Sequence, residues 1–281
     1  MQTTQIADKT PAPDPDILAR QSLEKIECKL MVMSGKGGVG KTSVSVNLAI
    51  ALADRGFKVG LLDVDIHGPD IPRMLGLHGM MSVNNTRQMK PMHYSENLAA
   101  VSMESLMQDK DEAVIWRGPM KHGAIRQFIG EVEWGLLDFL VIDAPPGTGD
   151  EPLTVAQLIP DAQAVVVTTP QEVALADVRK SINFCKTVKM EVCGVIENMS
   201  GYTCPHCAQT IDIFGSGGGE KTALATGLPF LGKIPFDPRM VQCADAGISF
   251  QAQHPDADAA NAFSKIAQDV ADRTITKKKQ A

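Results

Sequence analysis

The chain has no long hydrophobic run: no stretch of its 281 residues approaches the roughly 20 apolar residues that cross a bilayer. Aromatic residues are scarce, at nine Phe, two Trp and two Tyr, which disfavours recognition of nucleic acid by base stacking. Basic residues are not in excess, because 27 Lys and Arg stand against 33 Asp and Glu, a net charge of −6. We therefore expect neither nucleic acid nor a membrane as a partner.

The start of the chain also lacks a secretory signal, since residues 1–16 contain no apolar core. We therefore predict a cytoplasmic protein, whose thiols stay reduced. Residues 1–22 are polar and rich in Pro and Asp, which predicts a disordered lead-in. Residues 276–281 are expected to be a basic, solvated tail. Between them, residues 23–275 are long and apolar enough for one domain.

Apolar runs typical of buried strands alternate with helical patterns through this domain. Strands of that kind, separated by helices, indicate an α/β fold with a doubly wound, mostly parallel sheet. Residues 80–117 interrupt the alternation with two short pieces, 88–94 and 97–103, which predict an edge hairpin. The expected strands are 28–34, 58–65, 136–143, 162–170, 193–199 and 229–235, and the clearest helices are 40–56, 174–190 and 256–273.

A glycine-rich stretch joins the first expected strand to the first expected helix. Its sequence, GKGGVGKT, fits the P-loop pattern G-x-x-x-x-G-K-[ST] and predicts a P-loop NTPase. In that motif backbone N–H groups and the helix N-terminus hold phosphates. Lys41 is predicted to reach the β- and γ-phosphates, and the Thr42 hydroxyl to ligate Mg²⁺. The predicted nucleotide-binding residues of the loop are Gly35, Gly37, Gly38, Val39, Gly40, Lys41, Thr42 and Ser43.

Acidic residues follow the next two expected strands. Asp63 and Asp65 lie at the end of 58–65, and Asp143 ends 136–143 before a glycine-rich loop. Parallel sheets place their chemistry at the carboxyl ends of strands, which favours a role in the nucleotide site. Turn residues at strand ends remain the alternative for Asp63 and Asp65.

Lys36 directly follows the first glycine of the P-loop, and this second lysine marks the deviant Walker A ATPases. The chain resembles that class over residues 29–250. The resemblance implies Mg²⁺-dependent, slow ATP hydrolysis in a homodimer, with Lys36 reaching the nucleotide of the partner subunit. It further implies that Asp65 orients the attacking water, Asp63 supports the Mg²⁺ shell, and Asp143 holds Mg²⁺ through a water.

The same resemblance implies where the adenine ring lies. Asn198 matches the asparagine that contacts the base edge, and Pro235 and Asp237 belong to the segment beside the ring. Asn198 could equally cap a turn.

Cys204 and Cys207 lie two residues apart in a polar, glycine-rich stretch. That spacing is typical of metal or redox chemistry, yet a tetrahedral thiolate site needs four ligands. The other cysteines stand alone in apolar contexts and are expected to be buried: Cys28, Cys185, Cys193 and Cys243. A structural zinc site, a thioredoxin-like redox pair and an unliganded core pair are the alternatives for the two close cysteines.

Residues 198–221 are similar to the stretch that distinguishes the Mrp/ApbC iron–sulphur carriers from the MinD and ParA lines. The resemblance implies that Cys204 and Cys207 meet their own copies across a two-fold axis and hold a bridging [4Fe–4S] cluster. The implied partners are apo iron–sulphur proteins and a cluster assembly scaffold. Because Cys28 is the sole cysteine before the P-loop, a second stable cluster is not expected.

Two other functions share the predicted ATP site. A positioning ATPase like MinD or ParA would bind DNA or a membrane, which the charge balance disfavours. A reductase-activating ATPase would keep the cluster but move electrons.

Overall fold

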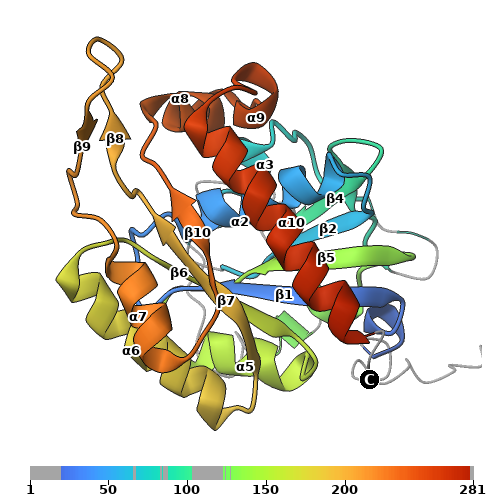
Figure 1. Cartoon of the computed structure of the whole chain (residues 1–281). Helices are drawn as coiled ribbons and strands as arrows, with labels where there is room; N and C mark the ends of the chain where they lie inside the picture. The colour runs from blue at the N-terminus through green and yellow to red at the C-terminus, as the bar shows by residue number, and fades with distance from the viewer. Residues whose placement is uncertain are drawn as a thin grey trace, which may run out of the picture.

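The computed structural model describes residues 20–278, apart from 66–67, 83, 85–87, 103–122, 124 and 127. Its centre is an eight-stranded sheet (Figure 1). The strands are β1 (Ile26–Met33), β2 (Val59–Asp63), β3 (Met92–His93), β4 (Leu98–Ser102), β5 (Leu137–Asp143), β6 (Gln163–Thr168), β7 (Glu191–Asn198) and β10 (Phe230–Ile234). Their order is β10-β7-β6-β1-β5-β2-β4-β3, and every pair except β3–β4 is parallel. The predicted doubly wound α/β fold is confirmed.

Helices cover both faces of the sheet, and none of those described is long and apolar enough to cross a membrane. One face carries α2 (Lys41–Ala53), α3 (Ile71–Met74), α8 (Pro238–Ala246), α9 (Phe250–Gln253) and α10 (Asp258–Lys278). The other carries α5 (Asp150–Leu158), α6 (Glu172–Thr187) and α7 (Gly218–Thr226).

Strand β1 shows how the sequence divides the core between these two faces. Leu30 and Val32 belong to the core under α2 and α10, whereas Met31 and Met33 belong to the core under α5 and α6. The alternation follows from the two-residue period of a strand. All four side chains are fully buried, so the strand before the P-loop is fixed from both sides.

A second, two-stranded sheet stands apart from the main body (Figure 1). It consists of β8 (Tyr202–Thr203) and β9 (Thr210–Ile211), which pair antiparallel. We call residues 200–217, which contain this hairpin, the cysteine arm. At its tip the Cys204 N–H donates to the carbonyl of Gln209, and Ala208 has a left-handed φ of 58°. The tight turn holds Cys204 and Cys207 at the far end of the arm.

The predicted edge hairpin is confirmed, because β3 and β4 pair antiparallel at one edge of the sheet, where β4 is also a parallel neighbour of β2. The structure corrects two boundaries. Helix α10 runs to Lys278, beyond the predicted end at Arg273 and into the predicted tail, because Thr274 and Ile275 continue its core-facing stripe. Residues 20–23 are helical, whereas the rest of the predicted lead-in lies outside the described residues.

Two glycines bring α3 and α8 into close contact. Gly247 ends α8 with a left-handed φ of 66°, and a Cβ added there would lie 2.6 Å from the Cα of Gly76. Gly76, just past α3, also has a left-handed φ, of 62°. Because α3 follows the Asp63–Asp65 segment, this contact links that segment to the end of α8.

We expect Gly247→Ala to lower the free energy of unfolding by about 2–4 kcal/mol, through left-handed strain plus the forced separation of the helices. The matched control is Gly227→Ala, at the end of α7, where φ is 69° and an added Cβ would meet nothing within 4 Å. Strain alone should cost it about 1 kcal/mol. Urea denaturation measures both losses, and equal losses would contradict a role for the close contact.

Candidate nucleotide site and cysteine arm

The P-loop surrounds a hollow of about 220 Å³ at the carboxyl end of β1. Gly38 and Gly40 both have a left-handed φ of 78°, and α2 begins directly after them at Lys41. Consecutive N–H groups in such a loop, together with a helix N-terminus, form a concave site for anions. The lining residues are Ser34, Lys36, Gly37, Gly38, Gly40, Lys41, Thr42, Ser43, Asp65 and Pro146.

The Asp143 carboxylate joins the P-loop helix to the middle of the sheet. Lys41 Nζ lies 2.7 Å from its Oδ1, and both groups are buried. The Thr42 hydroxyl donates to Oδ2 at 2.8 Å, and the Ser45 hydroxyl donates to Oδ1 at 2.7 Å. Thr42 and Asp143 therefore place oxygen atoms side by side, which fits the ligand preference of Mg²⁺. Ser45 was not predicted, although it lies one helical turn after Lys41.

Asp63 and Asp65 differ in their surroundings. Asp63 is fully buried opposite Asp143 in the β2–β5 ladder, where it accepts hydrogen bonds from the Ser102 hydroxyl and the Asp65 N–H. Burial, and then the neighbouring Asp143 charge, raise the pKa of Asp63 well above its usual range. Asp65 instead lines the hollow. The segment just after it, residues 66–67, lies outside the described residues.

Asn198, at the end of β7, lies against the P-loop. Its Nδ2 donates to the carbonyl of Val39 at 2.9 Å, and a Cβ added to Gly40 would collide with the same nitrogen. Gly35 packs against a different neighbour: a Cβ added there would collide with the backbone of Asp177 in α6. The sequence pattern shows neither packing constraint.

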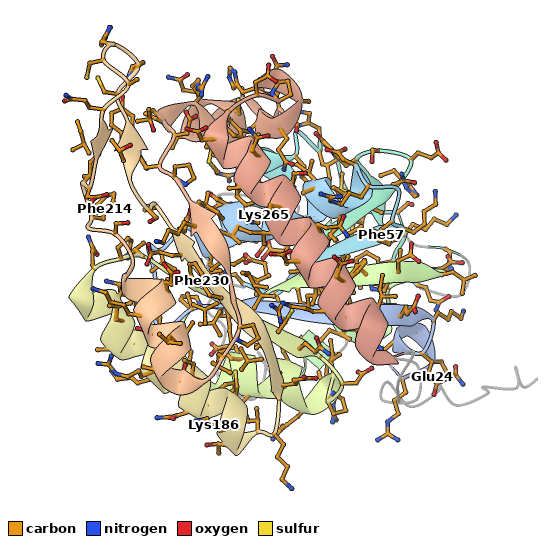
Figure 2. All side chains as sticks on the ribbon, viewed as in Figure 1. Glu24, Phe57, Lys186, Phe214, Phe230 and Lys265 are labelled. Carbon is orange, nitrogen blue, oxygen red and sulfur yellow. The ribbon has the colours of Figure 1, made fainter. Side chains whose placement is uncertain are left out.

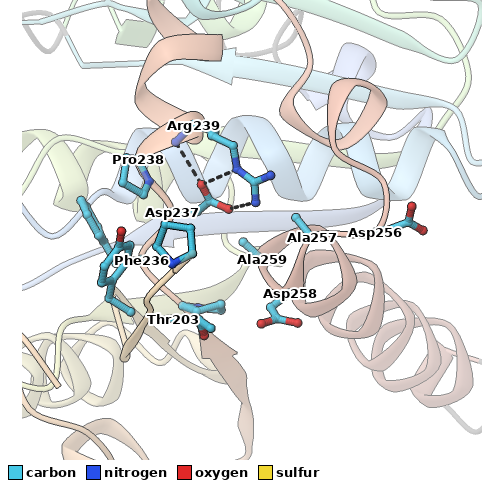
Figure 3. Close-up of a pocket in the computed structure, with 12 residues that line it drawn as sticks. Thr203, Phe236, Asp237, Pro238, Arg239, Asp256, Ala257, Asp258 and Ala259 are labelled. Carbon is cyan, nitrogen blue, oxygen red and sulfur yellow. Dashed lines mark hydrogen bonds and ion pairs between the residues drawn. The ribbon is translucent and has the colours of Figure 1, made fainter. Parts of the chain in front are cut away.

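Pro235 and Asp237 line a separate pocket of about 450 Å³, between the cysteine arm and the starts of α8 and α10 (Figure 3). Asp237 is paired there with Arg239, whose Nη2 lies 2.6 Å from its Oδ2. Pro235 directly follows β10, where Ile234 is the ladder partner of Asn198. The three residues predicted to contact adenine thus come from the ends of two neighbouring strands.

Of the six cysteines, Cys204 and Cys207 are the two that are not buried. Cys207 is exposed and Cys204 partly so, while the other four are buried as predicted. The His206 N–H, followed by the N–H and thiol of Cys207, lowers the pKa of the Cys204 thiol. Among the described residues of one chain, no three His, Cys, Asp or Glu side chains are grouped to hold a metal. The pair supplies two thiols, fewer than the four ligands that a tetrahedral thiolate site needs.

Phe236 supports the arm at its base. Its N–H donates to the carbonyl of Gly201 at 2.8 Å. Its ring makes edge contacts with Tyr202 and with Phe214, at centroid distances of 6.2 and 6.3 Å. Figure 2 shows Phe214 at the foot of the arm. The arm thus rests on the segment that contains Pro235 and Asp237.

The sheet order, the P-loop between β1 and α2, and the buried Asp143 define the chain as a P-loop NTPase. A family model described as the NUBPL iron-transfer P-loop NTPase matches residues 25–271. The chain belongs to that family.

Relatives and solved structures agree with this assignment. An iron–sulfur cluster carrier protein of Methanocaldococcus jannaschii is 47% identical over 264 residues, covering 94% of this chain and 90% of that protein. A cytosolic Fe–S cluster assembly factor, the NUBP2 homologue of Dictyostelium discoideum, is 47% identical over 239 residues, covering 83% and 90%. The structure of a nucleotide-binding protein from Archaeoglobus fulgidus in complex with ADP has a TM-score of 0.73 at 38% identity, covering 83% and 91%. The cell division ATPase MinD of Pyrococcus furiosus, at 24% identity and a TM-score of 0.64, covers 91% and 100% and shows the fold alone.

The two P-loop lysines should differ in their effect on the nucleotide-free protein. We expect Lys41→Ala to lower the free energy of unfolding by about 3 kcal/mol, because it leaves the buried Asp143 carboxylate without its cation. Lys36→Ala, at a half-buried loop position, should change it by less than about 0.5 kcal/mol. Chemical denaturation without nucleotide compares them, and similar losses would contradict the Lys41–Asp143 pair as the stabilising contact.

Proposed function

We propose that this chain is an ATP-hydrolysing carrier that assembles or holds a [4Fe–4S] cluster at a homodimer interface and transfers it to apoproteins. The observation that carries the proposal is the exposed Cys204–Cys207 pair, held on an arm of a chain that also has a P-loop hollow. Curated relatives that match over nearly their whole length are named as iron–sulfur cluster carriers. A cytoplasmic location is part of the proposal.

The hollow is proposed to take the phosphates of ATP, with its glycine N–H groups and Lys41 around them. Thr42 would hold Mg²⁺ directly and Asp143 through a water, with Asp63 supporting them from beneath. When bound, the ion neutralises charge on the β- and γ-phosphates. Asn198, Pro235 and Asp237 are proposed to contact the adenine ring, because Asn198 touches the P-loop and Pro235 follows the strand that pairs with β7.

Hydrolysis needs a positioned water and extra positive charge. Asp65, on the wall of the hollow, is proposed to accept a hydrogen bond from the water whose oxygen attacks the γ-phosphorus. The bond from that phosphorus to the β–γ bridging oxygen breaks, and ADP and phosphate leave. Lys36 is proposed to supply charge to the nucleotide of the partner subunit. Turnover is expected to be slow.

Two chains would complete the cluster site. A two-fold axis brings the same surface of each subunit together, so two copies of the arm supply four thiolates. Ile211 and Ile213, on the returning half of the arm, are 50% and 53% exposed and would be covered by such an interface. The cluster is cargo, received from an assembly scaffold and passed to apo iron–sulphur clients.

A positioning ATPase of the MinD or ParA kind is the other candidate, since those proteins share the fold. The net charge of −6 and the exposed cysteine pair favour the carrier. Nucleotide-dependent binding to DNA or to lipid vesicles that weakens with salt would favour the positioning ATPase instead.

Lys36→Ala is expected to lower ATP turnover by about 10³-fold while leaving ATP affinity nearly unchanged, as loss of a charge supplied in trans would do. ATP-dependent dimerisation should be lost with it. The matched control is Lys180→Ala, which removes a lysine 72% exposed on α6. Steady-state turnover and analytical ultracentrifugation measure the two effects. Normal turnover in the Lys36 variant would refute the trans role.

Anaerobic reconstitution with iron and sulphide should load about four irons and about four sulphides per dimer. The variant Cys204→Ala/Cys207→Ala should bind none, because the pair is the exposed thiol set. Cys193→Ala, which removes a buried thiol, serves as the control and should load normally. Metal analysis and visible absorption report the outcome. About one zinc per dimer that iron cannot replace would instead show that the cysteine pair forms a structural zinc site.

A further inference from the structure

Glu197 is a fully buried carboxylate that takes no part in the proposed ATP chemistry or in cluster ligation. It lies near the end of β7 and accepts three hydrogen bonds. Its Oε1 accepts from the Ser200 hydroxyl at 2.5 Å and from the Gly217 N–H at 2.8 Å, and its Oε2 accepts from the Gly219 N–H at 2.5 Å. A buried carboxylate with this many donors is held in one place.

The three donors come from the two ends of the cysteine arm. Ser200 is where the chain leaves β7 to enter the arm, while Gly217 and Gly219 are where it returns into α7. The N-terminus of α7 adds its favourable dipole to the carboxylate. A Cβ added to Gly219 would lie 3.1 Å from Oε2 of Glu197, closer than ordinary van der Waals contact, so glycine leaves room for this approach. One side chain therefore ties the entry of the arm to its exit.

Asn198, the residue after Glu197, contacts the P-loop. Because neighbouring side chains of a strand point to opposite faces, Asn198 turns toward α2 and donates to Val39 of the P-loop. The last two residues of β7 thus hold the P-loop on one face of the sheet and the cysteine arm on the other. Strand β7 lies between β6 and β10, so its end is supported on both sides.

We propose that Glu197 is a positioning residue that fixes the cysteine arm and, through Asn198, makes the two thiols respond to nucleotide in the P-loop. The inference rests on the proposed function in taking ATP as the ligand of that loop. A loop that shifts around phosphates shifts Asn198, and the Glu197 carboxylate carries the shift to both ends of the arm.

Thiol alkylation tests this without a cluster. The reduced full-length apoprotein is treated with iodoacetamide, with and without Mg²⁺ and a non-hydrolysable ATP analogue, and the adducts are counted by mass spectrometry. Because the other four cysteines are buried, early adducts report on Cys204 and Cys207. In the wild type, the analogue should change the alkylation rate of the pair several-fold.

Glu197→Gln keeps the shape of the side chain, but its amide NH₂ replaces one acceptor and faces an N–H donor. We expect alkylation about tenfold faster than in the wild type, and a rate that no longer depends on the analogue. Ser200→Ala, which removes one donor only, should lie in between. The matched control is Glu220→Gln on α7, whose side chain is 55% exposed and pairs with Lys233; it should match the wild type.

Analogue affinity and thermal unfolding are measured on every variant, because a merely structural role would change the alkylation rate but not its response to nucleotide. A Glu197→Gln variant that keeps the wild-type response would overturn the proposal, as would a wild type that binds the analogue without any response. Failure to reconstitute a cluster would count against the carrier function alone, since alkylation needs no cluster.

Discussion

The buried ion pair between Lys41 and Asp143 is the contact on which the arrangement of the site depends. It joins the first residue of α2 to the last residue of β5, and β5 lies between β1 and β2 at the centre of the sheet. A charge pair in the interior is tolerated only when its geometry and its other hydrogen bonds are good, and the hydroxyls of Thr42 and Ser45 provide those bonds. The pair fixes the P-loop against the two strands that carry the acidic residues, so one contact aligns the loop, Asp63 and Asp65.

Glu197 is another buried carboxylate, at the carboxyl end of β7, which β6 separates from β1 in the sheet. Asp143 accepts hydrogen bonds from the helix that follows the P-loop, and Glu197 accepts them from both ends of the cysteine arm. Asn198, the residue after Glu197 in β7, donates a hydrogen bond to the P-loop. The P-loop follows β1 and the cysteine arm follows β7, both at the carboxyl edge of one sheet, and the Asn198 contact joins them. This is the physical basis for proposing that nucleotide affects the thiols.

Local patterns in the sequence were sufficient for much of the fold and for part of the site. The strands, the P-loop and the two classes of cysteine follow from short-range signals: apolar runs, glycine spacing and the contrast between polar and apolar surroundings. Ser45, Ser102 and Glu197 were missed because their roles depend on partners brought together by the fold; the Asp143 that Ser45 contacts is 98 residues away. The roles predicted for Asp65, Asn198, Pro235 and Asp237 remain predictions, although Pro235 and Asp237 lie in a different pocket from the P-loop residues.

In the proposed function, one chain carries half of a cluster site and two chains complete it. Native mass spectrometry of the anaerobically reconstituted protein tests this most directly, because it reports subunit number and bound metal on the same particle. We expect one [4Fe–4S] cluster on each dimer and none on a monomer. A monomer that carries the cluster, or a dimer that carries only zinc, would contradict it.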